Sequence, residues 1–269
     1  TEYSQDPTLL GLLAWRSLYG PKLLDLLGHF AFVPDIEIVK LLSEVFAALF
    51  EILNEYAQSE AHEDVVFGCF VTVLSIARDR RFNLTGAVIA DFALTRREWK
   101  YASRCLVRAY LRLLTNPLDA EVSRRLRAAL KVGNLVLRLI LETTRMPPAT
   151  SHTEALTNGE HEGDADDQVA GETEDVRHPD IVQDLQNLFV ALMALMRNPM
   201  PVLLGTQTLV VQHFHTWLPE LAPYMPPSEI LEIATNLLDA CANAQGKMIL
   251  YRLIPVINYS HLDVFKPAE

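Results

Sequence analysis

The sequence has little cysteine and lacks the short motifs that mark common catalytic sites. Its three cysteines, Cys69, Cys105 and Cys241, lie far apart and form no C-x-x-C pair. An odd number of isolated cysteines favours small core residues in a reducing compartment over a disulfide framework. No glycine-rich phosphate loop, H-E-x-x-H or G-x-S-x-G motif is present. The sequence therefore predicts no catalytic residues, no metal site and no cofactor.

Long apolar runs and targeting signals are also missing. No apolar run reaches the ~18 residues that a membrane span needs. The N-terminus has no basic start, apolar core and small-residue cleavage site of the kind that forms a signal peptide. These absences predict a soluble, cytoplasmic protein without a transmembrane segment. The chain starts at Thr1 without a methionine, which favours a segment cut from a longer protein.

Apolar residues recur at helical spacing almost throughout the chain, whereas strand-like alternation is nearly absent. The stretch 65–81 is typical: Val66, Phe70, Val73, Leu74 and Ala77 are spaced three or four apart and make one buried helical face. A basic corner at 78–83 then ends the run. The predicted fold class is all-α.

Turn and capping residues divide the chain into helices. The predicted helices span 7–18, 22–30, 35–58, the stretch ending near 78, 84–94, 96–114, 119–145, 179–197, 201–217, 227–242 and 246–259. Asn83 and Asp119 are predicted N-caps, and Thr95 with Glu98 forms a capping box. Pro255 should kink or shorten the last helix.

The negative charge of the chain is concentrated in one segment. Residues 147–178 contain nine acids and one base, Arg177, so this segment carries −8 of the net charge of −11. With hardly an apolar residue, it cannot bury enough surface to offset chain entropy, and we expect a disordered acidic loop. Helical repeats at 1–146 and 179–269 flank it. At 40–47 residues per repeat, about five armadillo/HEAT-like units would form one continuous α-solenoid.

Several stretches in the same order resemble the helical region of the DOCK (dedicator of cytokinesis) family of Rho-GTPase guanine nucleotide exchange factors. They are 12–17, 41–54, 67–82, 102–145 and 202–261. In that family an armadillo-like region joins a lipid-binding domain upstream to the exchange domain downstream. The resemblance implies a non-catalytic scaffold segment in small-GTPase signalling. The long acidic insertion at 147–178 departs from the short connection expected there.

The resemblance also implies the partners of the longer protein. These are the flanking lipid-binding and exchange domains, a Rac-type or related Rho GTPase bound by the catalytic domain, and an engulfment-and-motility-type adaptor. The implied location is cytoplasmic, with recruitment of the longer protein to the plasma membrane. The GTPase itself, the oligomeric state and the solenoid face that meets the neighbouring domains do not follow from the sequence.

The alternative is a free-standing armadillo-type adaptor that binds extended peptides or proteins. Such adaptors use regularly repeated asparagines and tryptophans along a concave face. Here Asn54, Asn134, Asn187 and Asn236 have no constant period, and three tryptophans are too few. The exchange-factor segment is therefore preferred.

One helix face is unusually basic. Arg96, Lys100, Arg104, Arg108 and Arg112 recur every fourth residue, and residues 78–131 contain thirteen bases against five acids. We call these five residues the basic stripe. Like charges at this spacing repel, so an acidic group should lie nearby unless the stripe is simply solvated. The candidates are the acidic loop, an acidic partner and anionic lipid. Nucleic acid is not expected, because the aromatic residues near the stripe, Trp99, Tyr101 and Tyr110, mostly fall on the buried side and leave no stacking platform.

Two further features have bland interpretations. His213 and His215 stand two apart, so on a helix they point away from each other and do not form a metal pair. Arg104 and Arg108 flank Cys105 and would lower its pKa, yet no base with triad-like spacing accompanies it. We therefore predict no nucleophile at Cys105.

Overall fold

The structure, a computed structural model, describes residues 4–82, 84, 99, 101–144, 179–241 and 248–265. These residues form helices and connecting turns, without a strand in the described ranges. The α-helices are α1 (Pro7–Leu13), α2 (Gly20–Gly28), α3 (Asp35–Lys40), α4 (Leu42–Glu55), α5 (Glu60–Arg78), α7 (Ala102–Thr115), α8 (Ala120–Lys131), α9 (Gly133–Glu142), α10 (Pro179–Arg197), α11 (Leu204–His213), α12 (Leu218–Leu221), α13 (Pro227–Ala240) and α14 (Met248–Tyr259). The predicted all-α class is confirmed for this part of the chain.

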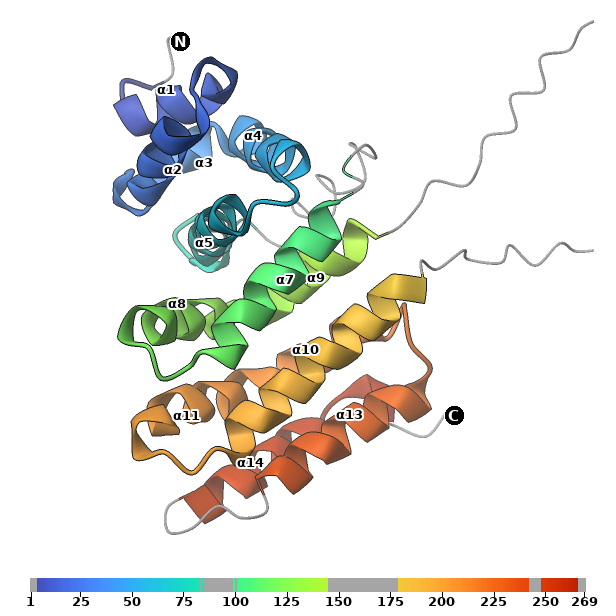
Figure 1. Cartoon of the computed structure of the whole chain (residues 1–269). Coiled ribbons are helices and arrows are strands. Elements are labelled where there is room, and N and C mark those ends of the chain that lie inside the picture. The colour runs from blue at the N-terminus through green and yellow to red at the C-terminus, as the bar shows by residue number, and fades with distance from the viewer. Residues whose placement is uncertain are drawn as a thin grey trace, which may run out of the picture.

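The helices stack in layers, as expected for an α-solenoid of helical repeats (Figure 1). Helices α7, α10 and α13 lie side by side along one side of the stack, and each packs against the next. Helices α8, α11 and α14 form a second row in the same order, and α4 and α5 extend the stack toward the N-terminus. Each layer buries its apolar face only by packing on its neighbours, as in other repeat proteins.

Helix α5 contains the predicted apolar face. Val66, Phe70, Val73, Leu74 and Ala77 are all buried, which confirms this face. This helix contacts α2, α4, α7 and α8, so the N-terminal layers of the stack all pack against it. After Arg78 the chain turns through a charged corner, where the Arg81 guanidinium donates to Asp79 and Asp35 at 2.8 and 2.9 Å.

Aromatic rings connect the layers through the core. Phe50 of α4 stacks on Trp99 with ring centroids 4.0 Å apart, and it also meets Phe70 of α5 at 4.7 Å. A second series continues from α5 to α10, with centroid distances of 5.4–6.2 Å between successive rings: Phe67, Tyr110, Trp217, Phe214 and Phe189. Contacts of this kind add to the hydrophobic burial of large side chains.

Several of the predicted helices are interrupted. The helix expected over 7–18 breaks at Ala14 and ends in a 3-10 turn. The helix expected over 35–58 breaks at Leu41, and that expected over 119–145 breaks at Val132. The segment 201–217 begins and ends in 3-10 turns, Pro201–Leu203 and Phe214–Thr216, on either side of α11. Apolar spacing continues through each break. This spacing indicates which face of the chain is buried, but it does not show where the helix axis changes direction.

Some local predictions are confirmed, and others fall outside the described residues. Asp119 accepts a hydrogen bond from the backbone N–H of Val122 at 2.9 Å and is the predicted N-cap of α8. Pro255 lies inside α14, which continues through it to Tyr259. The Asn83 cap, the Thr95–Glu98 box, nearly all of the helix predicted over 84–94, most of the first turn of the helix predicted over 96–114, and the acidic segment 147–178 lie outside the described residues. From Ala102 onward, the helix predicted over 96–114 is α7. The proposed domain boundaries stay predictions.

Candidate functional site

The described part of the basic stripe lies on α7. Arg104, Arg108 and Arg112 lie on successive turns of this helix, whereas Arg96 and Lys100 lie outside the described residues. The opposite face of α7 is buried as predicted, including Leu106, Tyr110 and, just before the helix, Trp99. Charge and packing thus occupy separate faces of α7.

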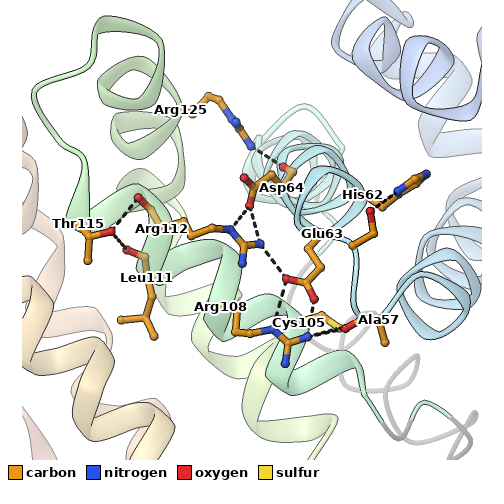
Figure 2. A network of polar contacts seen from close by, with 11 residues as sticks. Ala57, His62, Glu63, Asp64, Cys105, Arg108, Leu111, Arg112, Thr115 and Arg125 are labelled. Carbon is orange, nitrogen blue, oxygen red and sulfur yellow. Dashed lines mark hydrogen bonds and ion pairs between the residues drawn. The ribbon is translucent and has the colours of Figure 1, made fainter. Parts of the chain in front are cut away.

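Two of these arginines meet a buried carboxylate of α5 (Figure 2). The side chain of Glu63 is only 2% exposed, and it accepts from both Arg108 and Arg112. The Arg112 Nη2 lies 2.8 Å from Glu63 Oε2, and Arg108 forms an ion pair with Glu63 Oε1. Glu63 can be buried as a charge because two guanidinium groups and their hydrogen bonds surround it.

Further polar contacts extend this cluster to the neighbouring helices. Arg112 Nε donates to Asp64 Oδ1 at 2.7 Å, and Arg108 Nη2 donates to the carbonyl oxygen of Ala57, after α4, at 2.7 Å. Arg125 of α8 donates to the backbone oxygen of Asp64 (Figure 2). We call Glu63, Asp64, Arg108, Arg112 and Arg125 the arginine–carboxylate network. It joins α5, α7 and α8, and through Arg108 it also contacts the turn after α4.

Hydrogen bonds to carboxylates favour the charged state of the two arginines on α7. The hydrogen bond to Glu63 raises the pKa of Arg108 above its ordinary value. Burial alone would lower the pKa of Arg112, but hydrogen bonds to Asp64 and Glu63 outweigh it and raise that pKa. Removing one member of a buried ion pair is costly, because its partner is left as an uncompensated charge. The network therefore stabilises the packing of α5 on α7.

The acids opposite Arg108 and Arg112 belong to none of the groups considered from the sequence. Their partners are Glu63 and Asp64 of a packed helix. The available signal was the adjacent Glu-Asp pair in the first turns of an otherwise apolar helix, but acids there also suit the positive end of the helix dipole. Arg104 is the first described residue of the basic stripe, and its Nε lies 4.0 Å from Asp184 of α10. Whether the stripe contacts a partner or lipid stays a prediction.

Cys105 lies beneath the network and is not activated. Burial, and then the negative charge of Glu63, raise its pKa to about 12, although Arg108 opposes the shift. The prediction that its basic neighbours lower the pKa of Cys105 is therefore wrong. The sequence showed neither the burial of this thiol nor its closeness to Glu63. Burial likewise raises the pKa of Cys69 to about 12. Both thiols are protonated and buried at neutral pH, which agrees with their prediction as core residues.

The two histidines have packing roles. His213 ends α11, and His215 lies in the following 3-10 turn, where its Nδ1 is 3.2 Å from Asn258 Nδ2 of α14. Burial lowers the pKa of both imidazoles, and the charge of Arg78 lowers that of His213 further. No cluster of histidine, cysteine and carboxylate side chains suited to a metal ion occurs within the described ranges.

The helices were also compared with the length and hydropathy that a membrane span needs. Among the residues that the structure describes, no single helix is long and apolar enough to cross a bilayer. The segments Ile181–Arg197 and Pro201–Thr216 meet the criteria of length and composition only as a pair, with a bend of 119° between them.

Comparison with known protein families decides what this helical stack belongs to. The model described as "Dedicator of cytokinesis (DOCK) TPR region" matches residues 20–160, just over half of the chain. The chain belongs to the DOCK family. The matched residues include the whole arginine–carboxylate network, helices α2 to α5 and helices α7 to α9. The resemblance noted in the sequence is thereby confirmed.

Individual DOCK relatives are distant in sequence. The chain is 24% identical over 146 residues to dedicator of cytokinesis protein 4 of Homo sapiens, which covers 54% of the chain. It is 32% identical over 82 residues to dedicator of cytokinesis protein 3 of Mus musculus, which covers 30% of the chain. These matches span only 7% and 4% of the two DOCK relatives.

Proposed function

We propose that the chain is a non-catalytic scaffold segment of a DOCK-type guanine nucleotide exchange factor for Rac-type Rho GTPases. It would position a lipid-binding domain and an exchange domain of the same longer protein. The observation that carries this proposal is the match to the DOCK TPR region over residues 20–160. The small share of each relative that the chain spans supports a role for one region among several.

The physical features of the stack suit a spacer. Aromatic contacts run from α5 to α10, and the arginine–carboxylate network joins α5 to α7 and α8. A spacer fixes the distance between two domains only if its layers resist sliding. Cys69 and Cys105 are buried thiols with raised pKa values, so neither supplies a nucleophile for a competing enzymatic function.

The partners and location belong to the same proposal. The longer protein would bind a Rho-family GTPase through its exchange domain and an engulfment-and-motility-type adaptor elsewhere. It would work in the cytoplasm and at the plasma membrane. Within this segment, Arg96 and Lys100 are the stripe residues we assign to contact with an acidic partner or anionic lipid, since Arg108 and Arg112 pair with Glu63 and Arg104 lies beside Asp184.

The experiment is nucleotide exchange on a Rac-type GTPase by the full-length parent, with and without anionic liposomes. One variant carries Arg96→Glu and Lys100→Glu, and a second carries Glu63→Gln to loosen the stack. We expect the double variant to lose exchange on liposomes only, and the Glu63 variant to lose it in both settings. A parent without exchange activity on any Rho GTPase would refute the proposal. Unchanged exchange by the double variant would refute the stripe assignment alone.

A further inference from the structure

A groove lies between α10 and α13, away from the network and outside the residues that match the DOCK TPR region. The two helices run side by side in the C-terminal half of the stack (Figure 1). The groove has a volume of about 450 Å³, which is within the range of about 300–1,000 Å³ typical of ligand sites. It has no role in the proposed scaffold function.

The floor of the groove is apolar. Phe189 and Met193 of α10 and Met225, just before α13, line it and are buried, and Ile233 is half-buried beside them. Val190 also lines the groove, yet its side chain is 68% exposed. An exposed valine over an apolar floor leaves a hydrophobic surface that a partner's apolar side chain can cover.

Side-chain amides surround this floor on both helices. Gln183, Gln186 and Asn187 line the groove from α10, and Asn236 lines it from α13; all four are exposed. Gln183 Nε2 donates to Asn187 Oδ1 at 3.3 Å, which leaves further donors and acceptors on each amide. Amides match the unpaired N–H and C=O groups of an extended chain, whereas a helix has already used these groups internally. The lining therefore favours an extended peptide over a helix.

The charges around the groove are mostly negative. Glu229 and Glu232 of α13 are exposed and line it, and Arg197 near the end of α10 is the cation in the lining. Residues 179–241 contain six carboxylates and a single lysine or arginine, Arg197. This balance is the reverse of the basic region at 78–131. It attracts lysine and arginine side chains and repels acidic ones.

We propose that the groove between α10 and α13 binds an extended segment of a partner protein that carries an apolar side chain beside a lysine or arginine. The apolar side chain lies on Val190 and the floor, and the cation lies beside Glu229 and Glu232. Amide groups of Asn187 and Asn236 bond the peptide backbone. This surface is additional to the scaffold role and does not depend on exchange activity.

The probe is a set of capped eight-residue fluorescent peptides in which one leucine is flanked by lysine, glutamine or glutamate. Binding to the whole chain is followed by fluorescence anisotropy. We expect the lysine peptides to bind tightest and the glutamate peptides weakest. Glu232→Lys should weaken lysine-peptide binding about fivefold, since each exposed charge pair contributes modestly. Combined Glu229→Lys and Glu232→Lys should reverse the preference toward glutamate peptides.

Asp239→Lys is the matched control, because Asp239 is exposed on the same helix but does not line the groove. It should leave the peptide affinities unchanged. Each variant is used only if its melting temperature equals that of the unchanged chain. Asn187→Leu with Asn236→Leu should weaken every peptide that binds. Equal binding of lysine and glutamate peptides, or equal effects of Glu232→Lys and Asp239→Lys, would overturn the proposal. Tighter binding of a helix-constrained version of the same peptide would instead make the partner a helix.

Discussion

Gly133 and Trp217 are in such close contact that a Cβ atom on the glycine would lie 2.0 Å from Cζ2 of the indole. Gly133 begins α9 directly after the break at Val132, and the Trp217 side chain is 1% exposed. The indole ring also contacts Tyr110 and Phe214. The missing side chain at position 133 thus allows α9 to pack against the aromatic series of the core.

Gly133→Ala should therefore destabilise the protein, because the added methyl must displace a packed ring. We expect a loss of about 1–3 kcal/mol in the free energy of unfolding, typical of overpacking. Denaturant unfolding followed by tryptophan fluorescence measures it. The matched control is Gly68→Ala in α5, where an added Cβ meets no atom within 4 Å. That change should stabilise the protein by roughly 0.5–1 kcal/mol, and equal effects of the two substitutions would contradict this interpretation.

Glu63→Gln tests the arginine–carboxylate network. The substitution keeps the size of the side chain but leaves Arg108 and Arg112 without their shared carboxylate. A fully buried pair would lose 3–5 kcal/mol, and because these arginines keep some solvent contact we expect roughly 2–3 kcal/mol in the free energy of unfolding. Denaturant unfolding of the isolated chain is the measurement.

The control for this change is Glu60→Gln, an exposed acid in the first turn of the same helix. An exposed substitution of this kind should alter the unfolding free energy by less than about 0.5 kcal/mol. If the two variants were equally stable, the network would contribute no more than an ordinary surface charge.

Acidification should weaken the fold through the half-buried His213. Burial lowers the pKa of His213 below the value of 6.5 that it has when unfolded, and Arg78, His215 and Lys131 add to the shift. The unfolded state then binds the proton more readily, so the contribution to stability is complete above about pH 6.5 and declines as the pH falls below it. Unfolding free energies at pH 7.5 and 5.5 measure this loss.

In that experiment His213→Gln should lose less stability between the two pH values than the unchanged chain. The window stays above the range in which the carboxylates of Asp79 and Glu121 titrate, since hydrogen bonds to Arg81 and Arg124 lower their pKa values. NMR titration of His213 gives its pKa directly. An identical loss with and without His213 would assign the pH dependence elsewhere.

The cysteines should be unreactive in the native protein. Cys69 and Cys105 are buried and have pKa values of about 12, so at pH 8 a thiol reagent should modify them only after the protein opens. Glu63→Gln should accelerate modification of Cys105 more than that of Cys69, because it loosens the contact above Cys105. Rapid labelling of Cys105 in the unchanged chain would contradict this expectation. Mass spectrometry after timed labelling separates the sites.

The sequence predicts the helices well where burial and punctuation agree. The helix over 179–197 has the predicted bounds, since Pro179 and the Asn198-Pro199 pair delimit an apolar repeat. The break at Leu41 has no such signal, because the residues on both sides keep the same apolar spacing. At Gly133 the glycine itself was visible, but its reason was not. That reason is Trp217, which lies 84 positions away along the chain.

The candidate site divides in the same way. The spacing of Arg104, Arg108 and Arg112 predicts one helical face, and the structure has them on successive turns of α7. Their acidic partners could not be assigned, because Glu63 and Asp64 are brought to them by the packing of α5 on α7. The groove between α10 and α13 was also missed. Asn187 and Asn236 have no constant period along the chain, yet tertiary packing puts both in its lining.

The position of Glu63 and Asp64 has a mechanical consequence. A solenoid flexes when successive layers rotate about one another. Glu63 and Asp64 of α5 bind arginines of α7 and α8, and one of these, Arg108, also binds the backbone of Ala57 after α4. Any rotation at this level would stretch several charged hydrogen bonds at once, and their short range gives them little compliance. Under tension applied at the chain ends, this part of the stack should therefore act as a stiff block whose rupture is abrupt.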